Sequence, residues 1–195
     1  MSTTRTEQLV AGIQSWLQCE SPSNFPDGIA AMARIIADYA AAAGLTVELS
    51  SLGPTTGPLL YATNRAPGDT RPGILILAHM DTVHPVGTLL ENPVRIDGDR
   101  LYGPGSYDMK AGIYLALTAL AGVARPGATQ LPVDFLVVPD EETGSHASRV
   151  HIERFAANAK YALVCEPARP NGGKCVTARK LSLIHISEPT RLLSI

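Results

Sequence analysis

Three short apolar runs place the tightest constraint on the fold of this chain. They cover residues 73–78 (Gly-Ile-Leu-Ile-Leu-Ala), 133–138 (Val-Asp-Phe-Leu-Val-Val) and 161–165 (Tyr-Ala-Leu-Val-Cys). Runs of this length without strict polar alternation are typical of strands that are covered on both faces, as in parallel sheets. We therefore predict three central strands.

Helical patterns fill much of the remaining chain. Apolar residues recur at helical spacing, or Ala and Leu dominate, in four segments, near residues 9–17, 29–43, 109–123 and 151–159. A hairpin of two further strands is predicted over 45–49 and 58–62. This alternation predicts an α/β fold with a mostly parallel central sheet flanked by helices.

Composition narrows the class of protein. A chain of 195 residues with 45% apolar and 17% charged side chains forms one compact domain with a proper core. The formal net charge of −2 gives no excess of basic surface, so we expect neither nucleic acid nor a membrane as a partner. No apolar window approaches the ~18 residues of a membrane span, and the three cysteines lack CxxC spacing. A cytoplasmic location is the expectation.

Chemically active side chains follow each of the three apolar runs. Because the carboxyl ends of parallel strands share one edge of a sheet, where ligands bind, these side chains are expected to meet there. A further acid lies in the 103–108 loop, just before a predicted helix. The candidates are His79, Asp81, Asp108, Glu141, Glu142 and Glu166.

A cluster of carboxylates around one imidazole favours a metal site. Unpaired carboxylates in one crevice repel each other, and a divalent cation removes that penalty. The ligand set suits Zn²⁺, with Mn²⁺ or Co²⁺ as alternatives. No Gly-x-Ser-x-Gly, His-Glu-x-x-His or Gly-x-x-x-x-Gly-Lys-Ser/Thr motif is present, and Asp108 stands where a dinucleotide-binding loop needs its third glycine.

Four blocks of this sequence resemble the metal-site motifs of the M20 metallopeptidases. The blocks are His-Met-Asp-Thr-Val at 79–83, Gly-Pro-Gly-Ser-Tyr-Asp-Met-Lys-Ala-Gly at 103–112, Asp-Glu-Glu-Thr-Gly-Ser at 140–145 and Glu-Pro at 166–167. They stand in the family's order, and the glutamate carboxypeptidase branch is the most similar. The resemblance implies a zinc-exopeptidase-like catalytic domain.

The resemblance also implies a centre with two zinc ions. Asp108 resembles the carboxylate that bridges the two ions, His79 and Glu166 the other ligands of one ion, and Glu142 a ligand of the other. By the same resemblance, the peptide bond after Asp108 is expected to be cis.

Two further roles follow from the resemblance. Glu141 resembles the general base that deprotonates the bridging water, and Asp81 the acid that orients His79. Residues two apart in an extended chain point to the same side, so the Asp81 carboxylate can accept the second N–H of the ring.

The implied activity is hydrolysis of an amide or peptide bond next to a terminal carboxylate, with release of glutamate or a similar amino acid. The substrate would be a small peptide or an N-acyl amino acid. Alternatives are an acetylornithine deacetylase-like or succinyl-diaminopimelate desuccinylase-like amidohydrolase, or an inactive metal-binding fragment.

The last alternative arises from where the resemblance stops. Residues 1–180 resemble the N-terminal part of the catalytic domain, without the lid or dimerisation domain and the late histidine ligand of the family. The full-length protein is expected to form a homodimer through that lid, whereas this chain would hold one ion well and hydrolyse little. Residues 181–195 resemble a translated sequencing adapter, so we interpret them as a non-native tail; a genuine edge strand is the alternative.

Other polar residues have less specific interpretations. We predict His84 and His151 to be surface residues and His146 to lie in a solvated loop. Lys110 is either a structural anchor or a surface residue, and Asp108 taken alone would be the N-cap of its helix.

Overall fold

The computed structural model describes residues 4–167, so the predicted boundary at residue 180 and the predicted tail lie outside the described residues. No helix among the described residues is long and apolar enough to cross a membrane. In chain order the elements are α1 (Arg5–Leu17), α2 (Pro26–Ala42), β1 (Thr46–Ser51), β2 (Pro58–Thr63), β3 (Gly73–His79), α3 (Thr88–Glu91), β4 (Arg95–Asp97), β5 (Arg100–Tyr102), α4 (Lys110–Ala121), β6 (Val133–Val138), the short 3-10 helix η1 (Glu141–Thr143), α5 (Arg149–Ala157) and β7 (Ala159–Val164).

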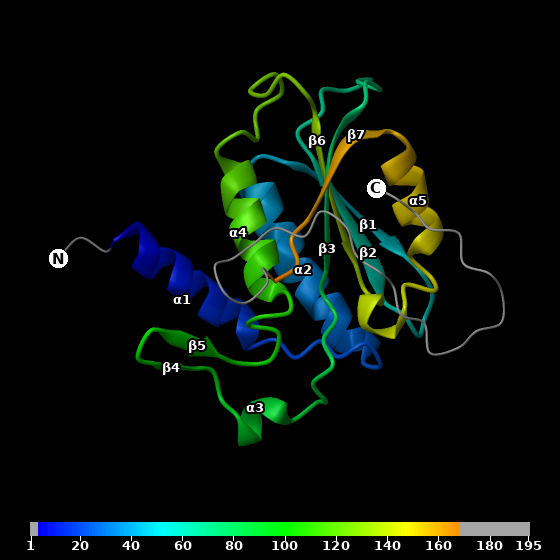
Figure 1. Cartoon of the computed structure of the whole chain (residues 1–195). Helices are drawn as coiled ribbons and strands as arrows, with labels where there is room; N and C mark the ends of the chain where they lie inside the picture. The colour runs from blue at the N-terminus through cyan, green and yellow to red at the C-terminus, as the bar shows by residue number, and fades with distance from the viewer. Residues whose placement is uncertain (1–3, 168–195) are drawn as a thin grey trace.

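A five-stranded sheet with the order β1-β2-β6-β3-β7 forms the centre of the fold (Figure 1). β3 pairs in parallel with both β6 and β7, while β2 is antiparallel to β1 and β6. β1, β6, β3 and β7 therefore run in one direction and β2 opposes them. This confirms the mostly parallel α/β sheet and the β1–β2 hairpin.

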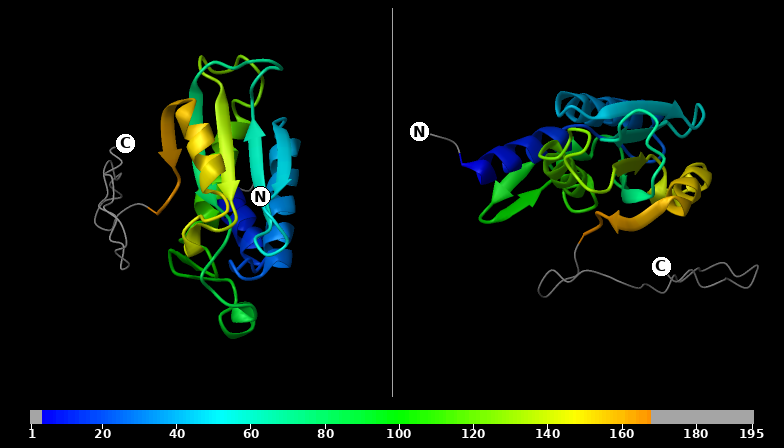
Figure 2. Two further views of the ribbon diagram at one scale, coloured as in Figure 1. Left: turned by 90° about the vertical axis from the view of Figure 1, so that its right-hand side faces the viewer. Right: turned by 90° about the horizontal axis from the view of Figure 1, so that it is seen from above.

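Helices cover both faces of the sheet, which gives three layers (Figure 2). The larger core lies between one face and helices α1, α2 and α4, and contains fully buried side chains such as Ile36, Leu117 and Phe135. The smaller core lies under α5, where Leu136 packs with Phe155. β6 is buried along its whole length, as expected of a strand with a neighbour on each side and a helix layer over each face.

The helix boundaries follow local sequence signals. Thr4 and Glu7 form a reciprocal capping box at the start of α1. Pro26 occupies the first turn of α2, where its missing N–H costs no hydrogen bond, and Gly44 follows the end of that helix with φ +87°. The two helices end where the apolar pattern predicts, but they begin at Arg5 and Pro26, several residues before the first apolar residues of that pattern.

The third predicted strand, over 161–165, is present as β7. β7 lies at the end of the sheet, where β3 is its one hydrogen-bonded neighbour among the described residues. Tyr161, Leu163 and Val164 are each more than half exposed. An apolar run reports that a strand can be buried, whereas burial itself depends on which segments pack against it.

A buried ion pair ties the opposite end of the sheet together. Arg65 donates to both carboxylate oxygens of Asp134, at 2.8 and 2.6 Å, and the Tyr61 hydroxyl donates to the same carboxylate at 2.7 Å. Burial alone would raise the pKa of Asp134, but these hydrogen bonds outweigh it and hold the pKa below its usual 3.8. The pair is remote from the strand ends that carry the candidate site.

Candidate metal centre

The carboxyl ends of two adjacent parallel strands deliver most of the candidate site. His79 is the last residue of β3 and is paired in register with Val138, the last residue of β6. The chain then turns through η1 after β6, which places Glu141 and Glu142 beside His79. Glu166 follows β7 on the other side of β3.

His79 is the centre of the cluster. Its side chain is 1% exposed, and its Nε2 lies 2.9 Å from Asp108 Oδ1, 3.5 Å from Glu166 Oε1 and 3.9 Å from Glu141 Oε2. Two sets of ligand atoms lie within 4.8 Å of one another, His79 with Asp108 and Glu142, and His79 with Glu141 and Glu166. Five side chains from four parts of the chain therefore converge on one point.

Asp81 fixes both the ring and the neighbouring turn. His79 Nδ1 faces the Asp81 backbone oxygen at 3.0 Å and Oδ1 at 3.3 Å, so Nδ1 carries a proton and Nε2 points at the cluster. The same buried carboxylate accepts the backbone N–H groups of Glu141 and Glu142, each at 3.1 Å, and the Ser23 hydroxyl at 2.7 Å. One carboxylate thus positions the imidazole and the two glutamates together.

Asp108 reaches the cluster from a loop rather than as a helix cap. The N-cap of α4 is Met109, without a side-chain cap, and the Asp108–Met109 peptide bond is cis as expected from the resemblance. Lys110 is fully buried, and its Nζ donates to the Cys19 carbonyl oxygen at 2.5 Å. Of the two interpretations of Lys110, the structure supports the structural anchor.

The carboxylates of the cluster repel one another electrostatically. Burial and the neighbouring Asp108 and Glu141 raise the pKa of Glu166 to about 7, against the opposing effect of His79. Burial, Asp108 and Glu141 likewise raise the pKa of Glu142. Burial opposes charge on the His79 ring, but its carboxylate neighbours outweigh this and raise its pKa to about 9.

These shifts fit the chemistry of a divalent-cation site. The raised pKa of His79 favours a protonated ring, which neutralises part of the negative charge of the carboxylates. A divalent ion would take over this neutralisation and keep every carboxylate ionised. One nitrogen and several oxygen donors suit Zn²⁺, Mn²⁺ or Co²⁺.

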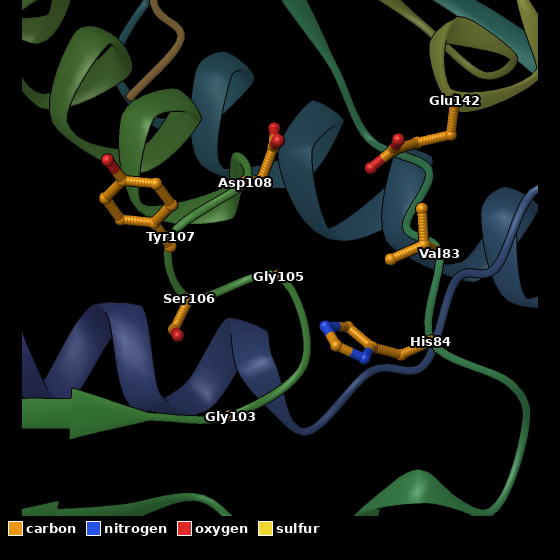
Figure 3. Close-up of a pocket in the computed structure, with 8 residues that line it drawn as sticks. All are labelled: Val83, His84, Gly103, Gly105, Ser106, Tyr107, Asp108 and Glu142. Atoms are coloured by element: carbon orange, nitrogen blue, oxygen red, sulfur yellow. The ribbon is translucent and has the colours of Figure 1, made fainter. Parts of the chain in front are cut away.

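A pocket of about 260 Å³ opens beside the cluster (Figure 3). Asp108 and Glu142 line one side of it, and His84, Ser106 and a turn containing two glycines line the other. His84 is exposed, as predicted, but its ring points into this pocket. His146 is exposed and His151 half-buried on α5, and neither lines the pocket.

The structure brings all six predicted site residues together. The convergence of His79, Asp108, Glu141, Glu142 and Glu166, and the contact of Asp81 with His79, agree with the order of the strand ends. Two contributors are not predicted from the sequence, Ser23 as a partner of Asp81 and His84 as a pocket residue. Ser23 lies 58 positions from Asp81, so no spacing rule links them.

Comparison with known proteins gives the family. Residues 75–192 match the family described as Peptidase family M20/M25/M40. This match spans more than half of the chain, which therefore belongs to that family of metallopeptidases and amidohydrolases.

Individual relatives are similar at a lower level. Carboxypeptidase G2 from Pseudomonas sp. (strain RS-16) is 30% identical over 168 residues, covering 85% of this chain and 40% of that protein. Succinyl-diaminopimelate desuccinylase from Gluconobacter oxydans (strain 621H) is 30% identical over 170 residues, covering 76% of this chain and 45% of that protein. The chain thus spans less than half the length of these curated relatives.

The fold is shared with solved structures of the family. An M20 family metallo-carboxypeptidase from Sulfolobus solfataricus superposes with a TM-score of 0.66 at 21% identity, covering 83% of this chain and 38% of that chain. At this identity the likeness shows the fold alone.

Proposed function

We propose that the protein carrying this chain is a zinc-dependent hydrolase that cleaves an amide or peptide bond next to a terminal carboxylate. The observation that carries the proposal is the convergence of four carboxylates on Nε2 of the buried His79. The name of the relative carboxypeptidase G2 supports a carboxypeptidase. The resemblance to the glutamate carboxypeptidase branch implies release of glutamate or a similar amino acid. The substrate would be a small peptide or an N-acyl amino acid.

The residues would hold two zinc ions as the family resemblance implies. Asp108 would bridge them, His79 and Glu166 would bind one ion, and Glu142 the other. When bound, the ions would lower the pKa of a shared water and stabilise negative charge on the scissile carbonyl oxygen. His79 is the one imidazole in the cluster among residues 4–167, so we propose that this chain alone holds one ion tightly and hydrolyses little.

Glu141 is proposed as the general base. Its side chain is 48% exposed, so water and substrate can reach the carboxylate, while its backbone N–H is fixed by Asp81. Glu141 would accept the proton of the attacking water at a carboxylate oxygen and return it to the leaving amine. Glu142, the neighbouring residue, is less exposed and is assigned to the metal.

A deacylase is the second candidate. The specific observation is that succinyl-diaminopimelate desuccinylases from two bacteria match this chain at 30% and 33% identity. The same residues would then hydrolyse the amide of a succinyl or acetyl group. A reducing compartment such as the cytoplasm belongs to the proposal, supported by the free thiols of Cys19 and Cys165.

The proposal is tested by a Glu141→Gln substitution in the whole protein. Zinc affinity is measured by calorimetry, and turnover by release of free amino acid from N-acetyl-L-glutamate and N-succinyl-L-glutamate. Because the base does not bind metal in this assignment, we expect zinc affinity within about threefold of the wild type and turnover lower by about 10²- to 10⁴-fold.

Glu153→Gln is the matched control. Glu153 is an exposed glutamate of α5 that pairs with Arg149 at 2.9 Å, away from the cluster. We expect it to change neither quantity. Turnover that survives Glu141→Gln would show that Glu141 is not the base, and a wild-type protein without zinc-dependent turnover of either compound would overturn the proposed function.

A further inference from the structure

The pocket beside the metal cluster has two chemically different sides. On one side, Asp108 and Glu142 belong to the proposed metal centre. On the other, the His84 ring points towards the turn of the loop that follows β5, and Ser106 lies in that loop (Figure 3). A group placed on the first side can therefore react, while the part of the molecule attached to it reaches the second.

Two glycines let this loop pack closely against the protein interior. Gly105 adopts φ +74°, and a Cβ there would lie 2.9 Å from Thr82 Cγ2 and 3.1 Å from Lys110 Cδ. At Gly103 a Cβ would lie 3.1 Å from a methyl group of Val94. Both positions disfavour larger side chains, so the path of the loop that lines the space of about 260 Å³ depends on them.

Both walls are tied to one short segment between α1 and α2. The Glu20 carboxylate accepts the backbone N–H groups of Gly87 and Leu89, each at 2.8 Å, and so fixes the loop that carries His84. The preceding carbonyl, that of Cys19, accepts the hydrogen bond from buried Lys110, which follows the Asp108 loop. The two sides of the pocket are thus held at a fixed separation.

We infer that this pocket is a subsite for a polar substrate side chain and that His84 is a specificity-determining residue. This inference rests on the proposed function, because it places the scissile bond at the metal cluster. The side chain enters between Val83 and the glycine turn and presents a hydrogen-bond acceptor to His84. The acceptor is the terminal carbonyl oxygen of a carboxylate or a carboxamide.

The donor on the second side determines this chemistry. The His84 imidazole can donate to such an oxygen, whereas none of the eight lining residues is a lysine or an arginine. Hydrogen bonding rather than a full opposite charge therefore selects the group, and a carboxamide satisfies the site as well as a carboxylate does. An apolar side chain of the same length would leave the His84 donor without this partner.

The test compares three ligands that differ at one end. The full 195-residue chain is loaded with zinc in the Glu141→Gln background, so that the ligands stay intact. N-acetyl-L-glutamine, N-acetyl-L-glutamate and N-acetyl-L-norvaline are titrated, and NMR reports both the Kd and the His84 ring signals. His84→Phe keeps a ring but removes the donor.

We expect His84→Phe to raise the Kd of the glutamine and glutamate derivatives about tenfold (about 1.4 kcal/mol) and that of the norvaline derivative less than twofold. The control His151→Phe, on α5, should change nothing. If the site required a carboxylate, the glutamine derivative would fail to bind while the glutamate derivative bound. This result would contradict selection by hydrogen bonding.

Other outcomes separate this inference from the proposed function. An equal change for all three ligands, or wild-type binding without a shift of the His84 signals, overturns the subsite. If the whole protein lacks turnover but the ligand difference at His84 remains, the proposed function fails and the subsite stands. Turnover of the whole protein with no ligand difference at His84 removes the subsite alone.

Discussion

Replacing Asp81 by asparagine tests the central physical claim about the metal cluster. In the wild type, Asp81 Oδ1 accepts Glu141 N–H and faces His79 Nδ1, while Oδ2 accepts Glu142 N–H and the Ser23 hydroxyl. All four partners can donate, and an asparagine offers one acceptor and one donor group. Either orientation of the amide therefore places its NH₂ group against native donors.

The two orientations differ in cost. An NH₂ in place of Oδ1 opposes both the Glu141 N–H and the ring nitrogen. An NH₂ in place of Oδ2 opposes the Glu142 N–H, but the Ser23 hydroxyl can rotate and accept from it. The second orientation should prevail, and it leaves one backbone N–H unpaired at a cost of about 1–3 kcal/mol of folding free energy.

Zinc affinity should fall as well. Loss of the charge that supports the His79 ring typically weakens a metal site by about 10- to 100-fold. Calorimetric titration measures the affinity, and urea unfolding of the metal-free protein measures stability. The signal for unfolding is the fluorescence of Trp16, the single tryptophan, which is 4% exposed and packs edge-on against Tyr39 and Tyr114.

Asp134→Asn is the matched control, because it also removes a buried, hydrogen-bonded carboxylate from the fold. Asp134 lies at the opposite end of the sheet with Arg65, so its loss should lower stability and leave zinc affinity within twofold. An Asp81→Asn protein that binds zinc as tightly as the wild type would refute the assigned role of Asp81. So would an equal loss of affinity in the control.

Two further predictions address stability and remote packing. Asp134 has a lowered pKa, so its contribution to stability is present above its unfolded pKa near 3.8 and is lost as the pH falls through the lower folded pKa. Between pH 6 and pH 3, the urea midpoint should therefore fall less steeply in Asp134→Asn than in the wild type. Parallel curves would contradict this. Gly112→Ala should weaken zinc binding without touching a ligand, because the new Cβ would lie 2.3 Å from the Cys165 carbonyl oxygen, next to Glu166. Gly122→Ala, whose new Cβ would be 3.4 Å from the nearest atom, is the control in the same titration. Equal zinc affinity of the two variants would show that the Cys165 backbone can shift without displacing Glu166.

The site was predictable from the sequence because its residues stand at strand ends. His79, Glu141 and Glu166 each follow an apolar run, and parallel strands bring their carboxyl ends to one edge. The position of β7 was not predictable in this way. Its residues have the composition of a central strand, but the exposure of Tyr161 and Leu163 depends on packing that is not encoded locally.

Contacts between distant loops form the other gap in prediction. Nothing near Ser23 indicates that its hydroxyl meets Asp81, and nothing near His84 indicates that Glu20 orders its loop. The α3 turn and the β4–β5 hairpin lie in a stretch for which no element is predicted. Such features depend on how the loops pack against the folded sheet, and the periodicity of apolar residues in the sequence does not predict this packing.

The connection between α1 and α2 holds a pocket loop independently of the sheet. The sheet register fixes His79 at the end of β3, whereas Glu20 holds the loop that carries His84 from a helical junction. A substitution at that junction can alter the spacing of the walls while every strand keeps its register. The loop that carries His84 can therefore change its position while His79 and its strand keep theirs.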